Sequence, residues 1–277
     1  MLQPYLRLVV SVLGVFALLC SQIALSEGPS DEFPGRQLFP DVPYTTSQDF
    51  HLMLKSNKVQ VVDVRSPYEF ETLHINGAVN IPVSSGNIDV EVQKLRESND
   101  RQITVYCDDK TCLDSYKVVR NSIAQGIQDI VAYDAGILDF AQSYPGDVAL
   151  LGKNLGDAKK LISKEQFKQH LISPDEFSGR VADTSDIVLD VRDRFQREGL
   201  SVFIGRESRV SLDNKKRLDR YIAKAQTQKK TLLIYDQSGV QVRWLQYYLE
   251  EKGVSSYYFM NGGMHAYYET IQSDLKK

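Results

Sequence analysis

The segment Val59-Gln-Val-Val-Asp-Val-Arg65 occurs again, with little change, as Ile187-Val-Leu-Asp-Val-Arg192. Each copy is a short apolar run that ends in an aspartate and an arginine, a pattern typical of a buried strand. Asp63 and Asp190 lie 127 positions apart. The repeat predicts that one structural unit is present twice in the chain.

Later landmarks keep nearly the same offset. Ile103-Thr-Val-Tyr106 matches Leu232-Leu-Ile-Tyr235, and Ala135-Gly136 matches Gly262-Gly263. A repeat of this length indicates a domain duplication, because solenoid repeats are much shorter.

Helix-like stretches at Thr46–Lys55 and Ser163–Leu171 precede the two opening strands. Buried strands that alternate with amphipathic helices predict an α/β fold, in which a parallel sheet has helices on both faces. With 277 residues, 42% of them apolar and 25% charged, the chain is long enough for two such domains. The predicted organisation is a signal peptide at 1–26, an extended lead-in at 27–43, a first domain at 44–150, a linker at 151–158 and a second domain at 159–277.

The N-terminus has the pattern of an export signal. Leu8–Cys20 is apolar at all but one position, and Ala24-Leu25-Ser26 has small residues at the first and third places before a cut. We therefore expect cleavage after Ser26 and a periplasmic protein. The alternatives are an uncleaved anchor at Leu8–Leu25 that leaves the chain facing the periplasm, and a lipoprotein modified at Cys20. A membrane is an expected partner only if the segment stays uncleaved.

Cleavage leaves two cysteines, Cys107 and Cys112. Cys107 directly follows the strand that ends at Tyr106, and its loop leads into a helix predicted to run to about Ala124. Ligands of parallel α/β sheets bind at this end of the strands. Main-chain N–H groups and the helix dipole favour a thiolate there, the form that attacks sulfur. The competing interpretation is a buried structural thiol.

Cys112 has three interpretations: a resolving cysteine, a disulfide partner of Cys107, or an incidental loop residue. In an oxidising compartment two lone cysteines this close either form a disulfide or are kept reduced for chemistry.

Five motifs carry a resemblance to a known family: Asp63-Val-Arg65, Tyr68-Glu69-Phe70, His74-Ile-Asn-Gly-Ala-Val-Asn-Ile-Pro82, Tyr106-Cys107 and Ala135-Gly136 followed by Phe140. They resemble the rhodanese (sulfurtransferase) superfamily, closely over Thr45–Tyr144 and more loosely over Leu161–Ile271. The resemblance implies that Cys107 carries sulfane sulfur as a persulfide.

The remaining site residues follow from this resemblance. Asp63 and Arg65 are expected to brace the active loop, and His74 to be a hydrogen-bonded turn residue rather than an acid or base. No cofactor is implied, and four scattered histidines give no metal-ligand spacing. The loop expected to hold the substrate or anion comprises Asp108, Asp109, Lys110, Thr111, Cys112, Leu113 and Ser115.

Two departures from the family pattern affect the expected chemistry. Ser115 lies eight positions after Cys107, so the loop is predicted to be two residues longer than usual. Asp108 and Asp109 are expected to oppose a thiolate and to repel the dianion thiosulfate, which favours a neutral or protein-borne donor.

The second domain has Asp236 where the first has Cys107, followed by Gln237-Ser238-Gly239. A carboxylate cannot hold a sulfane sulfur. Asp236 and Gly239 therefore mark a degenerate, silent site.

The leading hypothesis is an enzyme that takes sulfur from a sulfane donor and passes it to a thiol or another nucleophilic acceptor. The second is a thiol–disulfide or redox-sensing protein that uses Cys107 and Cys112, and the third is a non-catalytic binding scaffold. A net charge of −3 gives no reason to expect nucleic acid as a partner. A phosphatase is disfavoured because no arginine occurs between Cys107 and Ser115.

Overall fold

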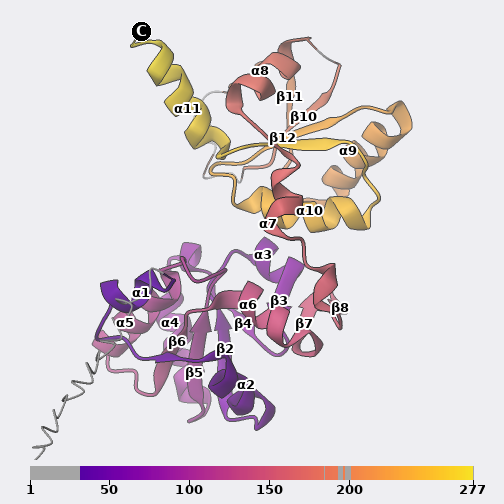
Figure 1. The fold of residues 1–277 in the computed structure, drawn as a ribbon. Coiled ribbons are helices and arrows are strands. Elements are labelled where there is room, and N and C mark those ends of the chain that lie inside the picture. Colours follow the sequence, from indigo (N-terminus) through magenta and orange to yellow (C-terminus); the bar gives the residue numbers. More distant parts are fainter. Residues whose placement is uncertain (1–31, 184, 193–195, 197–200, 277) are drawn as a thin grey trace, which may run out of the picture. The chain divides into compact units, whose positions relative to one another are not determined.

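The computed structural model describes residues 32–183, 185–192, 196 and 201–276. From Glu32 onward the chain contains two sheet-bearing halves (Figure 1). The signal peptide, its cleavage site, the anchor and lipoprotein alternatives and the first residues of the lead-in lie outside the described residues. Within the described part, no helix has both the length and the apolarity that a membrane span requires.

The predicted duplication is confirmed by two five-stranded parallel sheets with the same strand order. The first sheet has the order β1-β6-β5-β2-β4 and the second has the matching order β9-β13-β12-β10-β11. The first is built from β1 (Tyr44–Thr45), β2 (Val59–Asp63), β4 (Val79–Asn80), β5 (Gln102–Tyr106) and β6 (Ile130–Tyr133). The second is built from β9 (Leu171–Ile172), β10 (Ile187–Asp190), β11 (Glu207–Arg209), β12 (Leu232–Tyr235) and β13 (Tyr257–Met260).

The registers of the two sheets also correspond. Asp63 lies beside Tyr106 where β2 pairs with β5, and Asp190 lies beside Tyr235 where β10 pairs with β12. The residue after each tyrosine therefore occupies the equivalent position of its sheet, and these residues are Cys107 and Asp236.

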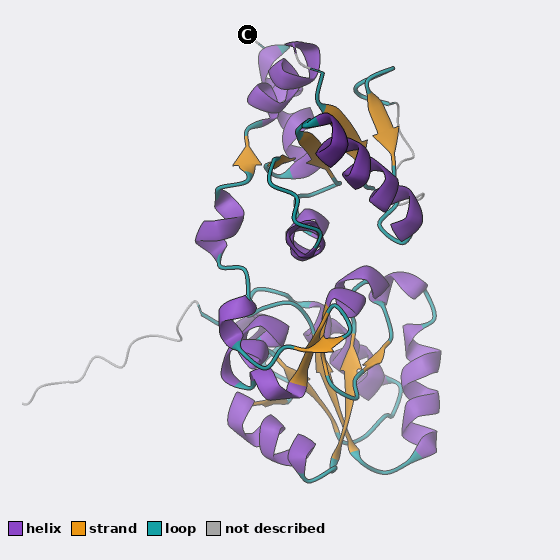
Figure 2. Cartoon of the chain, turned by 90° about the vertical axis from the view of Figure 1, so that its right-hand side faces the viewer, coloured by secondary structure: helices purple, strands orange, loops and turns teal. Residues whose placement is uncertain are grey.

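Helices cover both faces of each sheet, as the alternation of strands and helices predicts (Figures 1 and 2). The first domain contains α1 (Pro34–Leu38), α2 (Ser47–Lys55), α3 (Pro67–Thr72), α4 (Ile88–Ser98), α5 (Asp114–Ala124) and α6 (Gly136–Ser143). The second contains α7 (Lys164–Lys168), α8 (Pro174–Asp183), α9 (Lys215–Gln228), α10 (Gln241–Glu251) and α11 (Gly263–Asp274). A small antiparallel sheet of β3 (Leu73–Ile75), β7 (Val148–Leu150) and β8 (Lys153–Asn154) completes the first domain, with short 3-10 turns at Val83–Ser85, Pro145–Asp147 and Ala158–Lys160.

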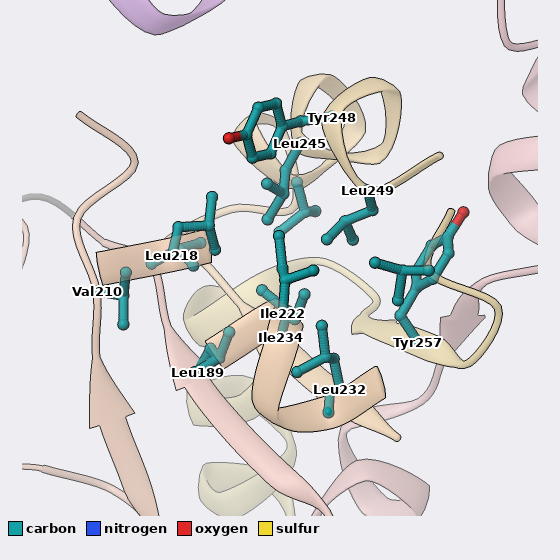
Figure 3. Packing of buried hydrophobic residues seen from close by; sticks show 14 of the residues in the cluster. Leu189, Val210, Leu218, Ile222, Leu232, Ile234, Leu245, Tyr248, Leu249 and Tyr257 are labelled. Atoms are coloured by element: carbon teal, nitrogen blue, oxygen red, sulfur yellow. The ribbon is translucent and has the colours of Figure 1, made fainter. Parts of the chain in front are cut away.

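Alternating strand residues supply the two layers of core. In β2, Val61 packs with Phe50 of α2 and Phe140 of α6, whereas Val62 packs on the opposite face with Val92 of α4. In the second domain, Leu218 of α9 and Leu245 of α10 pack in one cluster with Leu189 of β10 (Figure 3). Each sheet thus has core on both faces, and Trp244 and Tyr247 of α10 join one core cluster of the first domain.

One predicted helix is largely wrong. Of the stretch 163–171 only α7 is helical, and the true counterpart of α2 is α8, which begins at Pro174. Ser163 and Gln166 form a capping box that starts a helix, but this helix ends after five residues. Proline is favoured in the first turn of a helix, so Pro174 starts α8 instead of interrupting a helix.

The two connecting segments are more structured than predicted. The lead-in contains α1, and the buried ring of Phe39 stacks on that of Tyr116, with 5.5 Å between the ring centroids. The segment 151–158 contains β8 and the fully buried Leu155. Both segments are therefore packed parts of the first domain.

Candidate functional site

Cys107 lies in the loop between β5 and α5, at the carboxyl end of the sheet. It is 5% exposed and belongs to the apolar cluster between the sheet, α4 and α5. Seven positions separate Cys107 from the start of α5, whereas five separate Asp236 from the start of α10. The predicted two-residue insertion in the first loop is therefore present.

Cys107 and Cys112 form a disulfide, with 6.2 Å between their Cα atoms. Of the three interpretations of Cys112, the structure has the disulfide partner. Because both sulfur atoms are bonded to each other, neither is a free thiolate in this state. Persulfide chemistry at Cys107 therefore requires that the disulfide first be opened.

Asp109 organises the insertion. Its carboxylate accepts hydrogen bonds from the Thr111 amide at 3.0 Å and the Thr111 hydroxyl at 2.7 Å, and its carbonyl accepts the Cys112 amide at 3.1 Å. Two of the main-chain N–H groups expected to stabilise a sulfur anion are thus already bonded within the loop. The Asp109 carboxylate therefore stabilises its own loop, and it also lines the neighbouring cavity.

Glycine is required beneath the loop. Gly136 has a φ of +76°, and a Cβ atom added there would come within 2.5 Å of the Asp108 carbonyl and the Asp109 nitrogen. In the second domain a Cβ atom at Gly263 would come within 2.7 Å of the Asp236 carbonyl. Gly136 and Gly263, which correspond in the sequence repeat, therefore mark the place where each loop lies directly on the start of α6 or α11.

Arg65 joins the strand end to the loop. Its guanidinium donates to the Asp63 carboxylate at 3.0 and 2.6 Å, to the Leu73 carbonyl at 2.6 Å and to the Asp108 carboxylate at 3.3 Å. It also lies 4.9 Å from the centre of the Trp244 ring. Burial, the largest single influence, would lower the pKa of Arg65, but the charge and hydrogen bonds of Asp63 together with Tyr106 and Asp108 outweigh it and raise that pKa. Arg65 thus stays charged and holds Asp108 at the start of the loop.

Asp108 is strongly perturbed by its surroundings. Burial, reinforced by the charge of Glu69 and opposed by Arg65, raises the pKa of Asp108 from 3.8 to about 7. Near neutral pH its negative charge is therefore partly lost. The repulsion of anions expected from this residue is weaker than the sequence alone suggests.

The Lys110 side chain forms ion pairs with two acidic residues of the first domain and its lead-in. Its ammonium group lies 2.5 Å from the Glu32 carboxylate and 3.5 Å from that of Asp139. Leu113 is the N-cap residue of α5 and makes no side-chain capping bond. The Ser115 hydroxyl is buried and lacks a hydrogen-bond partner among the described residues.

The His74 side chain contacts Phe70, four residues earlier in the chain. Its Nδ1 donates to the Phe70 carbonyl at 2.6 Å, and its ring stacks on that of Phe70 with 4.1 Å between centroids. It lies in β3, beside Ala149 of β7. His74 is therefore hydrogen-bonded as expected, but it lies in a strand and not in a turn.

Asp236 shows what the equivalent position does in the second domain. Its carboxylate is 1% exposed and accepts main-chain hydrogen bonds from Gly239 at 2.5 Å, Gln241 at 2.7 Å and Val242 at 3.2 Å. Burial raises the pKa of Asp236, and these N–H groups partly offset the rise. Gly239 has a φ of +81°, a backbone conformation that favours glycine, in this loop. The position therefore has a ring of main-chain donors aimed at one side chain.

A cavity of about 420 Å³ opens beside the first loop. Cys112 lines it, whereas Cys107 does not. The second domain supplies most of its wall, including residues that the sequence analysis did not connect with the site. Its lining residues are Asp108, Asp109, Thr111, Cys112, Lys164, Phe167, Lys168, Leu171, Gly239, Val240, Arg243 and Trp244.

One group of potential metal ligands exists among the described residues. The two sulfur atoms and a carboxylate oxygen of Asp114 lie within 4.8 Å of one another. A disulfide offers no thiolate to a metal, so this group is not a metal site in the state described.

The family comparison agrees with the duplication. The family described as Rhodanese-like domain matches residues 46–143 and 173–270. A thiosulfate sulfurtransferase from Pseudomonas aeruginosa aligns with 16% identity and a TM-score of 0.37, over 83% of this chain and 42% of that protein. A Bacillus halodurans protein aligns with 24% identity and a TM-score of 0.35, over 44% of this chain and 85% of its own.

A rhodanese-related protein from Thermoplasma volcanium aligns with 22% identity and a TM-score of 0.29, over 36% of this chain and 92% of its own. None of the curated proteins compared with the chain matches it. The two family matches together cover well over half of the sequence, one in each sheet-containing half. The chain therefore belongs to the rhodanese-like domain family, of which it contains two copies.

Proposed function

We propose that this chain is a periplasmic sulfurtransferase that carries sulfane sulfur as a persulfide on Cys107 when its disulfide with Cys112 is open. Membership of the rhodanese-like family supports a function of this class. The apolar segment Leu8–Cys20 supports export, and an oxidising compartment suits a disulfide.

The observation that carries the proposal is the correspondence between Cys107 and Asp236. Both directly follow a strand at the same register of its sheet. The Asp236 carboxylate receives three main-chain N–H groups, which partly offset the burial that raises its pKa, so this position of the fold supplies hydrogen-bond donors to the side chain there. In the first domain the side chain at this position ends in sulfur. After reduction, its thiolate and its persulfide anion are acceptors that main-chain N–H groups at this position can stabilise.

The transfer has two steps. The Cys107 thiolate attacks the outer sulfur of a donor R–S–SH, a bond forms between the two sulfur atoms, and the donor's S–S bond breaks to release RS⁻. An acceptor thiolate then attacks the outer sulfur of Cys107–S–SH, leaves with it as a new persulfide, and restores the Cys107 thiolate. No oxidant or reductant is consumed.

The direct test uses the reduced full chain. After incubation with a sulfane donor and removal of excess reagent, intact mass spectrometry should find one added sulfur atom, and peptide mapping should locate it on Cys107. Cys112→Ser should keep the adduct, whereas Cys107→Ser should lose it. An adduct that persists in Cys107→Ser would overturn the proposal.

The disulfide favours a second candidate function, thiol–disulfide exchange by the same pair of cysteines. The two functions are compatible, because opening the disulfide would make Cys107 available for persulfide formation. Alkylation of freshly isolated protein tests the second function. A Cys107–Cys112 disulfide that opens with mild thiols supports it, and two cysteines that stay reduced in the presence of a disulfide oxidant count against it.

A further inference from the structure

We propose that outside thiols open the disulfide by attacking Cys112 from the cavity, and that the preferred attacking thiols carry a carboxylate. This inference rests on the second candidate function, thiol–disulfide exchange. It assigns an order to the two sulfur atoms and a substrate class to the cavity.

The order follows from access. A thiolate must reach the sulfur that it attacks, so exposure decides between the two atoms of a disulfide. Cys112 lines the cavity of about 420 Å³. Cys107 is 5% exposed, lies outside the cavity lining and packs in the cluster that contains Val105 and Val119. Attack from the cavity therefore meets Cys112 first.

The bond changes balance for this direction of attack. In the attack RS⁻ forms a bond to the Cys112 sulfur, the S–S bond breaks, and its electron pair stays on Cys107 as a thiolate. Cys107 lies between the end of β5 and the start of α5, and the N-cap of that helix makes no side-chain hydrogen bond. The positive end of the helix dipole stabilises a nearby anion, but Cys112 lies closer to it along the chain and the Asp114 carboxylate lies within 4.8 Å of both sulfur atoms, so access and not the leaving group decides the order. The mixed disulfide on Cys112 is then resolved by a second thiol or by return of Cys107.

The walls of the cavity indicate the class of thiol. Lys164, Lys168 and Arg243 line it with cationic groups, and Phe167 and Trp244 give it apolar surface. A carboxylate on a small hydrocarbon body is complementary to such a wall.

The two acidic residues of the cavity weaken this attraction only in part. Asp108 is paired with Arg65, and its raised pKa removes some of its charge near neutral pH. Asp109 is hydrogen-bonded by Thr111 and lies 4.0 Å from Arg243. The lysines of α7, which are exposed, remain available to an anionic thiol.

The test uses the full chain with its disulfide closed, as verified by intact mass before any thiol is added. Mercaptoacetate is added in limiting amount, the reaction is stopped with acid at short times, and free thiols are alkylated before peptide mapping. Mercaptoacetate should be found on Cys112 and the alkyl group on Cys107, with about a tenfold preference at the earliest time. Equal labelling, or mercaptoacetate mainly on Cys107, would overturn the order of attack.

A second arm tests the thiol class. Lys164→Glu/Lys168→Glu should slow opening by mercaptoacetate about fivefold, while opening by neutral mercaptoethanol stays within about twofold of the wild-type rate. Lys159→Glu/Lys216→Glu makes the same charge change on exposed lysines outside the cavity and should leave both rates unchanged. Equal slowing of both thiols by the cavity variant, or none, would overturn the carboxylate preference.

These outcomes are separate from the fate of the proposed sulfurtransferase. Sulfur uptake by the reduced chain tests Cys107 as a persulfide carrier, whereas opening of the oxidised chain tests Cys112 as the entry point. If oxidant fails to close the disulfide, the exchange function and this inference fall together, and the persulfide proposal is still tested by its own adduct.

Discussion

Gly136 lies against the main chain of Asp108, so that a single added carbon atom at position 136 would come within 2.5 Å of the Asp108 carbonyl. The active loop and the start of α6 therefore share one close contact. The amides of Ile137 and Leu138 donate to the carbonyls of Cys107 and Asp108 at the same place, at 3.0 and 3.3 Å. These contacts hold the main chain of Cys107 and Asp108 against the start of α6.

Gly136→Ala should displace the loop and lower the free energy of unfolding by about 2–4 kcal/mol, because alanine is strained at positive φ and its Cβ clashes with the loop. Urea unfolding followed by circular dichroism measures the loss. Gly146→Ala is the matched control, since a Cβ atom at Gly146 has no neighbour within 4 Å and its φ is not positive. Equal stability of the two variants would contradict the described contact.

Arg65→Gln should cost about 3–5 kcal/mol of stability, because it leaves the carboxylate of Asp63 buried without its cation. The double variant Asp63→Asn/Arg65→Gln should recover part of this loss. Thermal and urea unfolding of the single and double variants give the comparison. If the loss of stability in the double variant equals the sum of the losses measured for Arg65→Gln and for Asp63→Asn alone, the two residues are not a coupled pair.

Asp108 should make stability depend on pH. Its pKa is about 7 in the folded chain and near 3.8 when unperturbed, so the folded chain binds the extra proton between these values. The free energy of unfolding contributed by Asp108 should therefore fall as the pH rises from about 4 to about 7. Asp108→Asn should remove this fall, as measured by urea unfolding at several pH values. Asp109→Asn, which leaves Asp108 in place, should keep it.

Asp236→Ala should destabilise the second domain by about 1–3 kcal/mol, because it leaves three main-chain N–H groups without their acceptor. Asp236→Asn keeps a side-chain oxygen and should cost less. The variants can be compared by urea unfolding with the single tryptophan, Trp244 of α10, as the fluorescent probe. If alanine is tolerated as well as asparagine, the ring of donors is not what stabilises this loop.

The mature protein should begin at Glu27 and be recovered in the periplasmic fraction. Small residues at Ala24 and Ser26 meet the requirement of signal peptidase. Intact mass of the exported protein checks the cleavage site directly. A mass that retains residues 1–26 would favour the uncleaved anchor.

Much of the fold could be predicted because its evidence is local in the sequence. The strands that precede Cys107 and Asp236 are short apolar runs, and the helix after Cys107 ends at Ala124 as expected. The helix expected at 163–171 was placed too early, because the capping box at Ser163 starts only the short α7, whereas α8 begins at Pro174.

The cavity could not be predicted because it depends on tertiary packing. Lys164 and Lys168 lie more than fifty positions from Cys112, and no periodicity connects them. Trp244 is buried on the second domain's α10, but it packs with the core of the first domain and lines the cavity. Likewise, the raised pKa of Asp108 comes from burial and from Glu69, which only the folded chain brings together.

The most direct test of the central claim, that Cys107 carries the sulfur chemistry of this chain, is peptide mass spectrometry of the protein isolated from cells under immediate thiol alkylation. The account predicts that Cys107 is found as a persulfide or in a disulfide with Cys112, and that supplying the cells with a sulfane donor increases the persulfide fraction. Cys107 found only as an unmodified free thiol, with or without the donor, would contradict it.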